Sequence, residues 1–131
     1  MDKTTLLGIR RLAAAGAWRD ALEQVDALLT QYPDDAVAWC ERGTLLLLHA
    51  PQRADEAMQA FDTSIGLDET NPMSLYNRGC LHAHNNDFNA AARDVAAAIA
   101  RDADCLDMAR EDESFIAARA TTLFQALLAD D

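Results

Sequence analysis

Apolar residues recur along most of the chain at intervals of three and four, a spacing that places them on one face of an α-helix. Alanine is abundant and runs of β-branched residues are absent, which also favours helix over strand. The sequence therefore predicts an all-α fold. The pattern predicts six helices, at residues 3–15, 18–31, 35–49, 53–67, 72–85 and 88–101.

Short polar or proline-containing stretches separate the predicted helices. YPDDA at 32–36 and TNPMS at 70–74 each combine Pro with Asp or Asn. Asn71 is predicted to cap the fifth helix, with Pro72 at its first position, because both residue types favour those positions. Shorter turns, each joining two helices into a pair, are predicted at 14–20, 50–56 and 85–91.

The same residue types return at a nearly constant spacing. Gly79 lies 36 residues after Gly43, and each of the two glycines directly follows an arginine. Ala57 lies 36 residues after Ala21 and 34 residues before Ala91. The stretch HAPQRADEA breaks this register once with extra residues. A helix pair that returns at this interval indicates a repeat protein.

The pattern resembles the tetratricopeptide repeat (TPR) family, whose repeat is a helix–turn–helix unit of about 34 residues. The matching residues in repeats two and three are Trp39, Gly43, Ala57, Phe61, Leu75, Gly79, Phe88, Ala91 and Ala98. Repeat one matches less closely, because Ile9 stands where the glycine belongs, although Trp18, Ala21 and Pro33 fit. The resemblance implies one domain over residues 1–131, an α-solenoid of three repeats with a C-terminal capping segment. The implied bounds are about 2–35, 36–71 and 72–105 for the repeats and 106–131 for the cap.

The resemblance gives the two mid-helix glycines a packing role. Small residues lie in this family where neighbouring helices cross most closely. A glycine inside a helix costs about 1 kcal/mol relative to alanine, so it needs a reason of this kind. We therefore expect Gly43 and Gly79 to face a neighbouring helix, and we expect no catalytic role for Gly79.

The repeat pattern fades beyond residue 104. The remaining sequence predicts a short helix at 105–111 and a longer one at 114–128. The longer helix is expected to carry an apolar stripe formed by Ile116, Ala120, Leu123 and Leu127. Two phenylalanines, Phe115 and Phe124, flank this stripe. A stack of repeats needs an atypical last element to cover its apolar face, so we expect this segment to be the cap. The alternatives are that it folds into the groove or docks on a second copy of the chain.

The net charge limits the classes of partner that we expect, and the cysteine content indicates the cellular compartment. The chain has 11 basic and 22 acidic residues, a formal net charge of −11. Such a surface repels phosphate backbones and anionic membranes, so neither nucleic acid nor a membrane is an expected partner. An odd number of cysteines without a close pair indicates reduced thiols. Since the start of the chain also lacks a signal-peptide pattern, we expect a cytoplasmic protein.

Motifs for catalysis and for metal binding are missing from the sequence. It contains no GxSxG, no P-loop and no glycine-rich dinucleotide turn, so we expect neither an enzyme nor a cofactor. Cys80 and His84 share a helical face, and the family register places Cys40 on the same side of the preceding repeat. A metal-binding or redox protein built on these three residues stays an alternative. No metal site is predicted, because zinc needs three or four oriented ligands and the chain has neither CxxC nor HExxH.

The resemblance implies a non-catalytic module that binds a peptide or helix of a partner protein. Such repeats bind in a concave groove lined by the first helix of each pair. The groove positions implied by the register are Leu6, Arg10, Val37, Cys40, Thr44, Leu47, Met73, Tyr76, Asn77, Cys80 and His84. Tyr76 would be an aromatic anchor. The four leucines at 45–48 suit an apolar groove, because they wrap around a helix and cannot all face one core, although other parts of the chain could cover some of them.

One subtype of this function can be weighed, and one alternative function stays open. Family members that grip the acidic C-termini of heat-shock chaperones use basic and amide side chains to hold the peptide carboxylate. Glu41 at one matching position would repel a carboxylate, so this subtype is not expected. The alternative function is a small acidic chaperone, similar to those of type III secretion, that holds an aggregation-prone client. A homo-oligomer formed through the groove or the tail also stays open.

Overall fold

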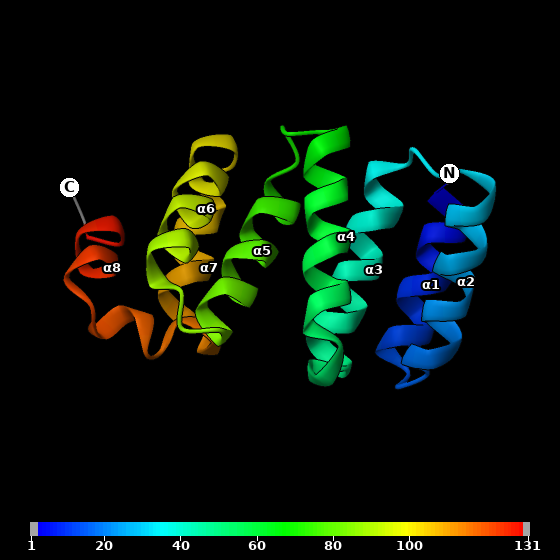
Figure 1. Ribbon diagram of the computed structural model, residues 1–131, viewed down its shortest axis with the longest axis horizontal. Coiled ribbons are helices and arrows are strands. Elements are labelled where there is room, and N and C mark those ends of the chain that lie inside the picture. Colours follow the sequence, from blue (N-terminus) through cyan, green and yellow to red (C-terminus); the bar gives the residue numbers. More distant parts are fainter. Residues whose placement is uncertain (1–2, 130–131) are drawn as a thin grey trace. The chain divides into compact units, whose positions relative to one another are not determined.

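The computed structural model describes residues 3–129, and within that range the chain forms helices and no strand (Figure 1). Two compact units divide the chain, Met1–Glu69 (unit 1) and Thr70–Asp131 (unit 2). The division falls close to the predicted boundary between the second and third repeats, at residues 71 and 72.

Unit 1 contains two helix pairs. Its elements are α1 (Lys3–Ala14), α2 (Trp18–Gln31), α3 (Ala36–His49), the 3₁₀ turn η1 (Pro51–Arg53) and α4 (Ala54–Leu67). Each α-helix packs against the next one in the chain. The four helices predicted here agree with the structure to within a residue at each end. The short turn η1 accommodates the extra residues of HAPQRADEA.

Unit 2 contains one full helix pair followed by shorter elements. They are α5 (Pro72–His84), α6 (Phe88–Arg101), α7 (Asp104–Glu111), two 3₁₀ turns η2 (Glu113–Phe115) and η3 (Ala118–Ala120), and α8 (Thr122–Leu127). Helix α6 packs against α5, α7 and α8, while η2 packs against α5. The segment from α7 to α8 therefore lies on the third helix pair as a cap.

Side-chain caps fix where three of the long helices begin. The carboxylates of Asp35 and Asp87 each accept a hydrogen bond from the backbone N–H three residues later, at 3.1 and 3.2 Å. Asn71 accepts one from Met73 N–H at 3.0 Å, and Pro72 follows it at the helix start. These bonds satisfy amide groups that have no partner within the helix. The predicted cap at Asn71 is confirmed.

The turn inside the first and third pairs has the same geometry. Gly16 and Asn86 have positive φ angles of 85° and 61°, in the left-handed region that glycine and asparagine tolerate. The N–H of Ala17 donates to the carbonyl of Leu12, five residues earlier, at 2.8 Å. In the third pair the N–H of Asp87 donates in the same way to the carbonyl of His82, at 2.9 Å. These are helix-ending motifs with a left-handed residue. The two positions lie two repeat lengths apart, so the turn belongs to the repeat.

Both mid-helix glycines face the partner helix of their own pair. A Cβ placed on Gly43 would lie 2.6 Å from Cε1 of Phe61, which is fully buried on α4. A Cβ on Gly79 would lie 3.0 Å from Cγ2 of Val95 and 3.3 Å from the backbone oxygen of Ala91, both on α6. A methyl group would overlap with Phe61 at Gly43 and would be tightly packed at Gly79, so the close packing expected for the two glycines is confirmed.

Gly43→Ala is expected to lower the free energy of unfolding by about 1–2 kcal/mol, because overpacking against Phe61 outweighs the gain in helix propensity. Gly8→Ala is the matched control. Gly8 also lies inside a helix of unit 1, but a Cβ there has no neighbour within 4 Å. Gly8→Ala should therefore raise the free energy of unfolding by up to about 1 kcal/mol. Urea unfolding followed by circular dichroism measures both changes, and the same sign for the two variants would contradict the packing argument.

The prediction of one long helix at 114–128 is wrong. Two 3₁₀ turns and the six-residue helix α8 occupy this stretch instead. Arg119 links this segment to the end of α7, because its Nη1 donates to the carbonyls of Ala109 and Asp112, at 2.9 and 2.8 Å. Thr121 has an extended backbone and accepts a hydrogen bond from Phe124 N–H at 3.2 Å, so it starts a new helix.

The face of this segment that is buried also differs from the prediction. Phe115, Ala118 and Phe124 are fully buried, whereas Ile116 is 64% exposed and Leu123 is 43% exposed. The rings of Phe115 and Phe124 lie 5.4 Å apart between centroids. The two phenylalanines, which the sequence placed beside the apolar stripe, therefore form the centre of the cap.

Candidate partner-binding face

An ion pair connects the first helices of the two pairs in unit 1. Oε1 of Glu41 on α3 accepts hydrogen bonds from Nε and Nη2 of Arg10 on α1, at 2.9 and 2.6 Å. Positions 10 and 41 therefore lie side by side, as the register implies. Because the two charges neutralise each other, Arg10 is not available as half of a clamp for a peptide carboxylate.

Apolar side chains lie on the same stripe of α3 as Glu41. Val37, one turn earlier, is 40% exposed, and Leu48, two turns later, is 68% exposed. Leu6 lies one turn before Arg10 on α1 and is half-buried. We call this surface the first-helix face of unit 1; it comprises Leu6, Arg10, Val37, Glu41, Thr44, Leu47 and Leu48.

The remaining predicted residues of unit 1 are less accessible. Thr44 and Leu47 are half-buried, and the Thr44 hydroxyl donates to the carbonyl of Cys40 at 2.8 Å. Cys40 itself is buried. In the leucine run, Leu45 and Leu46 are buried while only the last residue is fully exposed. The four leucines therefore do not all face one core, as expected from their spacing.

The cap covers the first helix of unit 2. Tyr76 and Cys80, two predicted groove residues on α5, are only 2% and 3% exposed. The Tyr76 hydroxyl donates to Oδ2 of Asp112 at 2.8 Å, and the Cys80 thiol lies 3.8 Å from the same oxygen. The ring of Phe115 meets Tyr76 edge-on, with centroids 5.7 Å apart. Neither residue is open to a partner in this structure, because residues 112–115 already lie against them.

The other predicted residues of α5 lie at the edges of this contact. Met73 is 38% exposed and Asn77 is half-buried. Nε2 of His84, an exposed residue, lies 3.0 Å from the Ser114 hydroxyl. The structure thus brings Tyr76, Cys80 and His84 together as expected, but their neighbours are the chain's own C-terminal residues.

Burial and hydrogen bonding determine which of the groups in this contact are charged. Burial raises the pKa of Tyr76 and raises that of the Cys80 thiol to about 12, so both stay neutral at physiological pH. Burial alone would raise the pKa of Asp112, but hydrogen bonds from Ser114 and Tyr76 outweigh burial and lower it. The contribution of Asp112 to stability is therefore present above the usual carboxyl range and is lost as the pH falls through the lowered pKa.

The cysteines do not favour the metal or redox alternative. Cys40, Cys80 and Cys105 are free and buried, and burial also raises the pKa of Cys105. A reactive cysteine needs a stabilised thiolate, which burial opposes. Within residues 3–129, no three His, Cys, Asp or Glu side chains gather as metal ligands. His82, beside this region, instead has Nε2 3.5 Å from Oδ2 of Asp94.

Sequence reasoning missed an ion pair that holds the third helix pair together. Nε and Nη2 of Arg78 donate to the two carboxylate oxygens of Asp94, each at 2.7 Å. The side chain of Asp94 is 9% exposed, so this pair is largely shielded from water. Arg42, the arginine before the other mid-helix glycine, pairs with Asp26 at 2.8 Å. The recurring Arg–Gly dipeptide was the signal that could have indicated these pairs.

The comparisons with known proteins support the fold. No protein-family model matches the chain, and no curated protein matches it significantly. Among solved structures, the chain is similar to the crystal structure of MamA, a TPR-containing protein, with a TM-score of 0.65 at 19% sequence identity. The match covers 92% of this chain and 72% of the MamA chain. Such low identity establishes the fold alone.

The fold class predicted from the sequence is confirmed. The chain is all-α, an α-solenoid of TPR-like helix–turn–helix repeats with a C-terminal capping segment. No helix in the described part of the chain combines the length and the apolar character needed to cross a membrane.

Proposed function

We propose that this protein is a non-catalytic interaction module of the TPR family, an adaptor or scaffold, that binds a peptide or helix of a partner protein. The binding site we propose is the first-helix face of unit 1. The observation that carries the proposal is the exposure of Val37 and Leu48 on the stripe of α3 that also holds Glu41. Exposed apolar residues on one helical face form the kind of surface that binds an apolar partner.

The charges on this face favour a ligand that binds through apolar side chains. The pair between Arg10 and Glu41 leaves the middle of the face without net charge. A ligand carboxylate would compete with Glu41 for Arg10 and would gain little, because exposed ion pairs contribute only about 0–1 kcal/mol. We therefore propose a ligand with aliphatic or aromatic side chains spaced to reach both ends of the stripe.

Unit 2 contains an internal example of such binding. Residues 112–115, which are Asp112 and the 3₁₀ turn η2, lie on α5, the first helix of the third pair, and contact it mainly through an aspartate and a phenylalanine. A short peptide of the same chain thus occupies the face that corresponds to the one proposed here. This supports the inference that first-helix faces of this protein accept peptide segments.

The test compares partner capture by four forms of the protein. Val37→Glu and Leu48→Glu should each reduce recovery of a partner at least about tenfold, because a buried charge opposes binding in an apolar contact. Leu67→Glu is the matched control, since Leu67 is 42% exposed on the second helix α4, away from the proposed face. A partner retained by all variants would move the site elsewhere.

Photocrosslinking gives the same test without relying on affinity. Replacing Leu48 by p-benzoylphenylalanine should crosslink the captured partner, whereas the same replacement at Leu67 should not. The identity of the partner then separates the two candidate functions. A partner that becomes unstable or aggregates in cells lacking this protein would indicate a client-holding chaperone, and a partner that stays stable would indicate an adaptor.

A further inference from the structure

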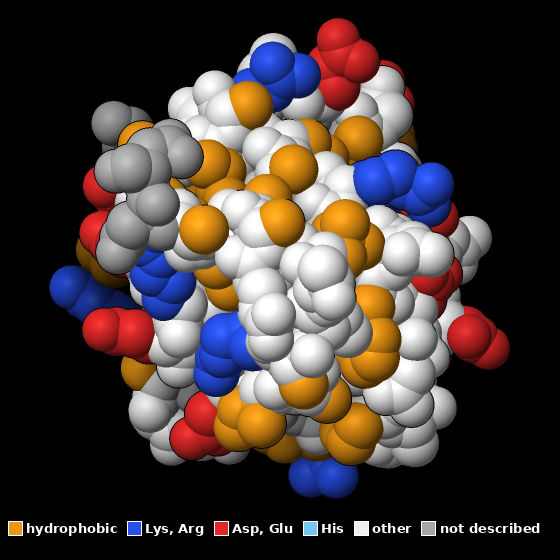
Figure 2. Space-filling model, turned by 90° about the vertical axis from the view of Figure 1, so that its left-hand side faces the viewer, with side chains coloured by type: hydrophobic (Ala, Val, Ile, Leu, Met, Phe, Trp, Pro, Cys, Tyr) orange, Lys and Arg blue, Asp and Glu red, His pale blue; other side chains and the backbone are white. Residues whose placement is uncertain are grey.

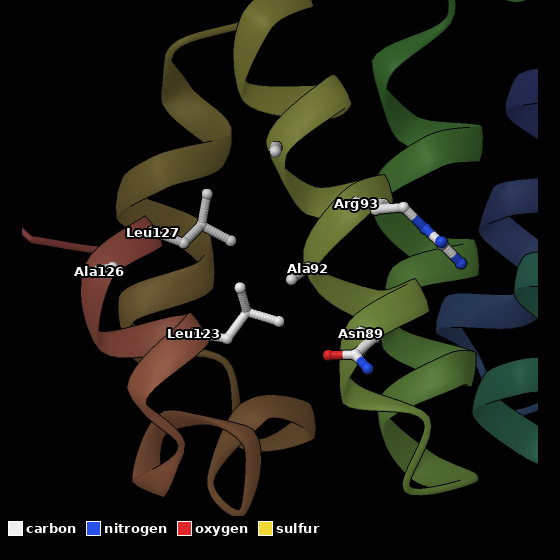
Figure 3. A pocket seen from close by; sticks show the side chains of 7 residues that line it. Asn89, Ala92, Arg93, Leu123, Ala126 and Leu127 are labelled. Carbon is white, nitrogen blue, oxygen red and sulfur yellow. The ribbon is translucent and has the colours of Figure 1, made fainter.

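A second surface, within unit 2, has the features of a binding site and is separate from the first-helix face. An open hollow of about 650 Å³ lies between α6 and α8. Ala92, Ala96, Leu123 and Leu127 line it, with Asn89 and Arg93 along its α6 side (Figure 3). We call it the α6–α8 hollow. Leu123 and Leu127 point from α8 toward Ala92 across the hollow in Figure 3.

The unequal lengths of the two helices explain why the hollow exists. Helix α6 has 14 residues, whereas α8 has only six, so α8 cannot cover the whole outward face of α6. The residues of α6 that line the hollow recur at three, four and seven positions from Asn89, which is the spacing of one helical face. Of these, Arg93 and Ala96 are exposed, whereas Ala92 is only 6% exposed. The lining residues of α6 extend over about 10 Å of the helix, or two turns, at a rise of about 1.5 Å per residue. This length suits a third helix lying beside them.

The side chains of the hollow suit close approach by a helix. The small side chain of Ala96, which is exposed, allows a ligand to approach the backbone of α6 closely, and Ala92 forms the floor of the hollow beside it. Leu123 is 43% exposed, and Leu127 is half-buried. Figure 2, seen from the side of α8, shows hydrophobic side chains gathered over this end of unit 2 and acidic ones mostly toward the edge. Because the hollow is open, it would cover one stripe of a ligand, as grooves for helices do.

The charge beside the hollow specifies the partner further. No acidic residue lines the hollow, in a chain with 22 acidic and 11 basic residues. Arg93 is exposed and, among the residues that the structure describes, has no hydrogen bond or ion pair. By contrast, Arg10 and Arg42 each have a carboxylate partner. Figure 3 shows Arg93 on the side of α6 away from α8, so a ligand helix that lies along α6 in the hollow would reach the guanidinium with side chains that extend over α6.

We propose that the α6–α8 hollow binds an amphipathic helix of a partner protein. Aliphatic side chains of that helix, three or four positions apart, contact Ala92, Ala96 and Leu127. An aspartate or glutamate on its outer side pairs with Arg93. This site is independent of the first-helix face, so the protein can bind one segment there and another in the hollow, as a scaffold does.

The test uses a phage-displayed library of amphipathic helical peptides of about 18 residues, long enough to hold a helix. Leucines are fixed at one stripe, and the flanking positions vary among acidic, basic and neutral residues. Selection on the full chain should enrich acidic residues on one side of the leucine stripe. The affinity of an enriched peptide is then measured by fluorescence anisotropy against five variants.

Leu123→Glu and Arg93→Glu should each weaken the selected peptide at least about tenfold, because both place a negative charge where the ligand packs or pairs. Ile116→Glu and Arg101→Glu are the matched controls. Both control residues are exposed in unit 2 and lie outside the hollow, so the affinity should change less than about twofold. Reversing the peptide's acidic residue to lysine should restore binding to Arg93→Glu.

Four results would overturn the proposal. One is selection of no peptide whose binding responds to Leu123→Glu. Another is enrichment without acidic residues, together with unchanged binding to Arg93→Glu. The third is self-association in light scattering that Leu123→Glu abolishes, which would assign the hollow to a second copy of the chain. Loss of binding to Val37→Glu would point to the first-helix face instead and would also contradict the proposal.

Discussion

Phe115→Ala is expected to lower the free energy of unfolding by about 3–5 kcal/mol, the usual loss for a buried phenylalanine. Phe115 is fully buried between Tyr76 and Phe124, with ring centroids 5.7 and 5.4 Å away. Removing the ring leaves a cavity at the centre of the cap and takes away the edge contact with Tyr76. The loss is large beside the total stability of about 5–15 kcal/mol that is typical of a domain.

Ile116→Ala is the control for this change, because the neighbouring Ile116 is 64% exposed. It should change stability by no more than about 0.5 kcal/mol. Both tryptophans, Trp18 and Trp39, lie in unit 1, so tryptophan fluorescence follows that unit, whereas circular dichroism follows the helices of both. The loss should therefore appear in circular dichroism. Equal losses for the two variants would contradict the central role of Phe115 in the cap.

Asp94→Ala is expected to lower the free energy of unfolding by about 2–3 kcal/mol, because it removes the bidentate partner of a largely buried arginine. The side chains of Arg78 and Asp94 are 24% and 9% exposed. The guanidinium would lose two charge-assisted hydrogen bonds while it stays mostly out of water. The expected value lies below that for a fully buried pair, because water still reaches part of Arg78.

Asp26→Ala tests whether exposure accounts for the size of this effect. Asp26 makes a single bond to Arg42, at 2.8 Å, and its side chain is 48% exposed. Arg42 would keep its second partner Glu56, 3.4 Å away, which also reduces the expected loss. The loss of Asp26 should cost no more than about 1 kcal/mol, as for other surface ion pairs. Thermal or urea unfolding of both variants gives the comparison. If Asp26→Ala were as costly as Asp94→Ala, shielding from water would not be the cause.

The repeats could be predicted from the sequence because their signals are local. Helix periodicity, the cap at Asn71 and the spacing of Gly43 and Gly79 each depend on residues close together or on the repeat itself. The packing of the glycines followed from the same reasoning, since only a close crossing justifies a glycine inside a helix. These features were therefore readable without knowledge of the rest of the chain.

The cap and its effect on the site could not be predicted in the same way. Residues 112–121 have helical periodicity, but tertiary contacts accompany a different backbone there. Arg119 bonds to backbone carbonyls at the end of α7, and Phe115 packs on Tyr76, 39 positions earlier in the chain. A register taken from the family places Tyr76 in a groove and carries no information on what covers it. The missed clue was chemical, because a buried tyrosine hydroxyl needs a hydrogen-bond partner and Asp112 supplies it.

The contact between the cap and α5 has a consequence for the order of folding. Helices α1 to α6 pair with chain neighbours, and contacts between neighbours close short loops and form early. The hydrogen bond from Tyr76 to Asp112 instead joins residues 36 positions apart, against 16 for Arg78 and Asp94. We expect the helix pair α5–α6 to form first and closure of the cap to follow as a slower step. Until that step, Tyr76 and Cys80 are exposed to any other chain in the cell.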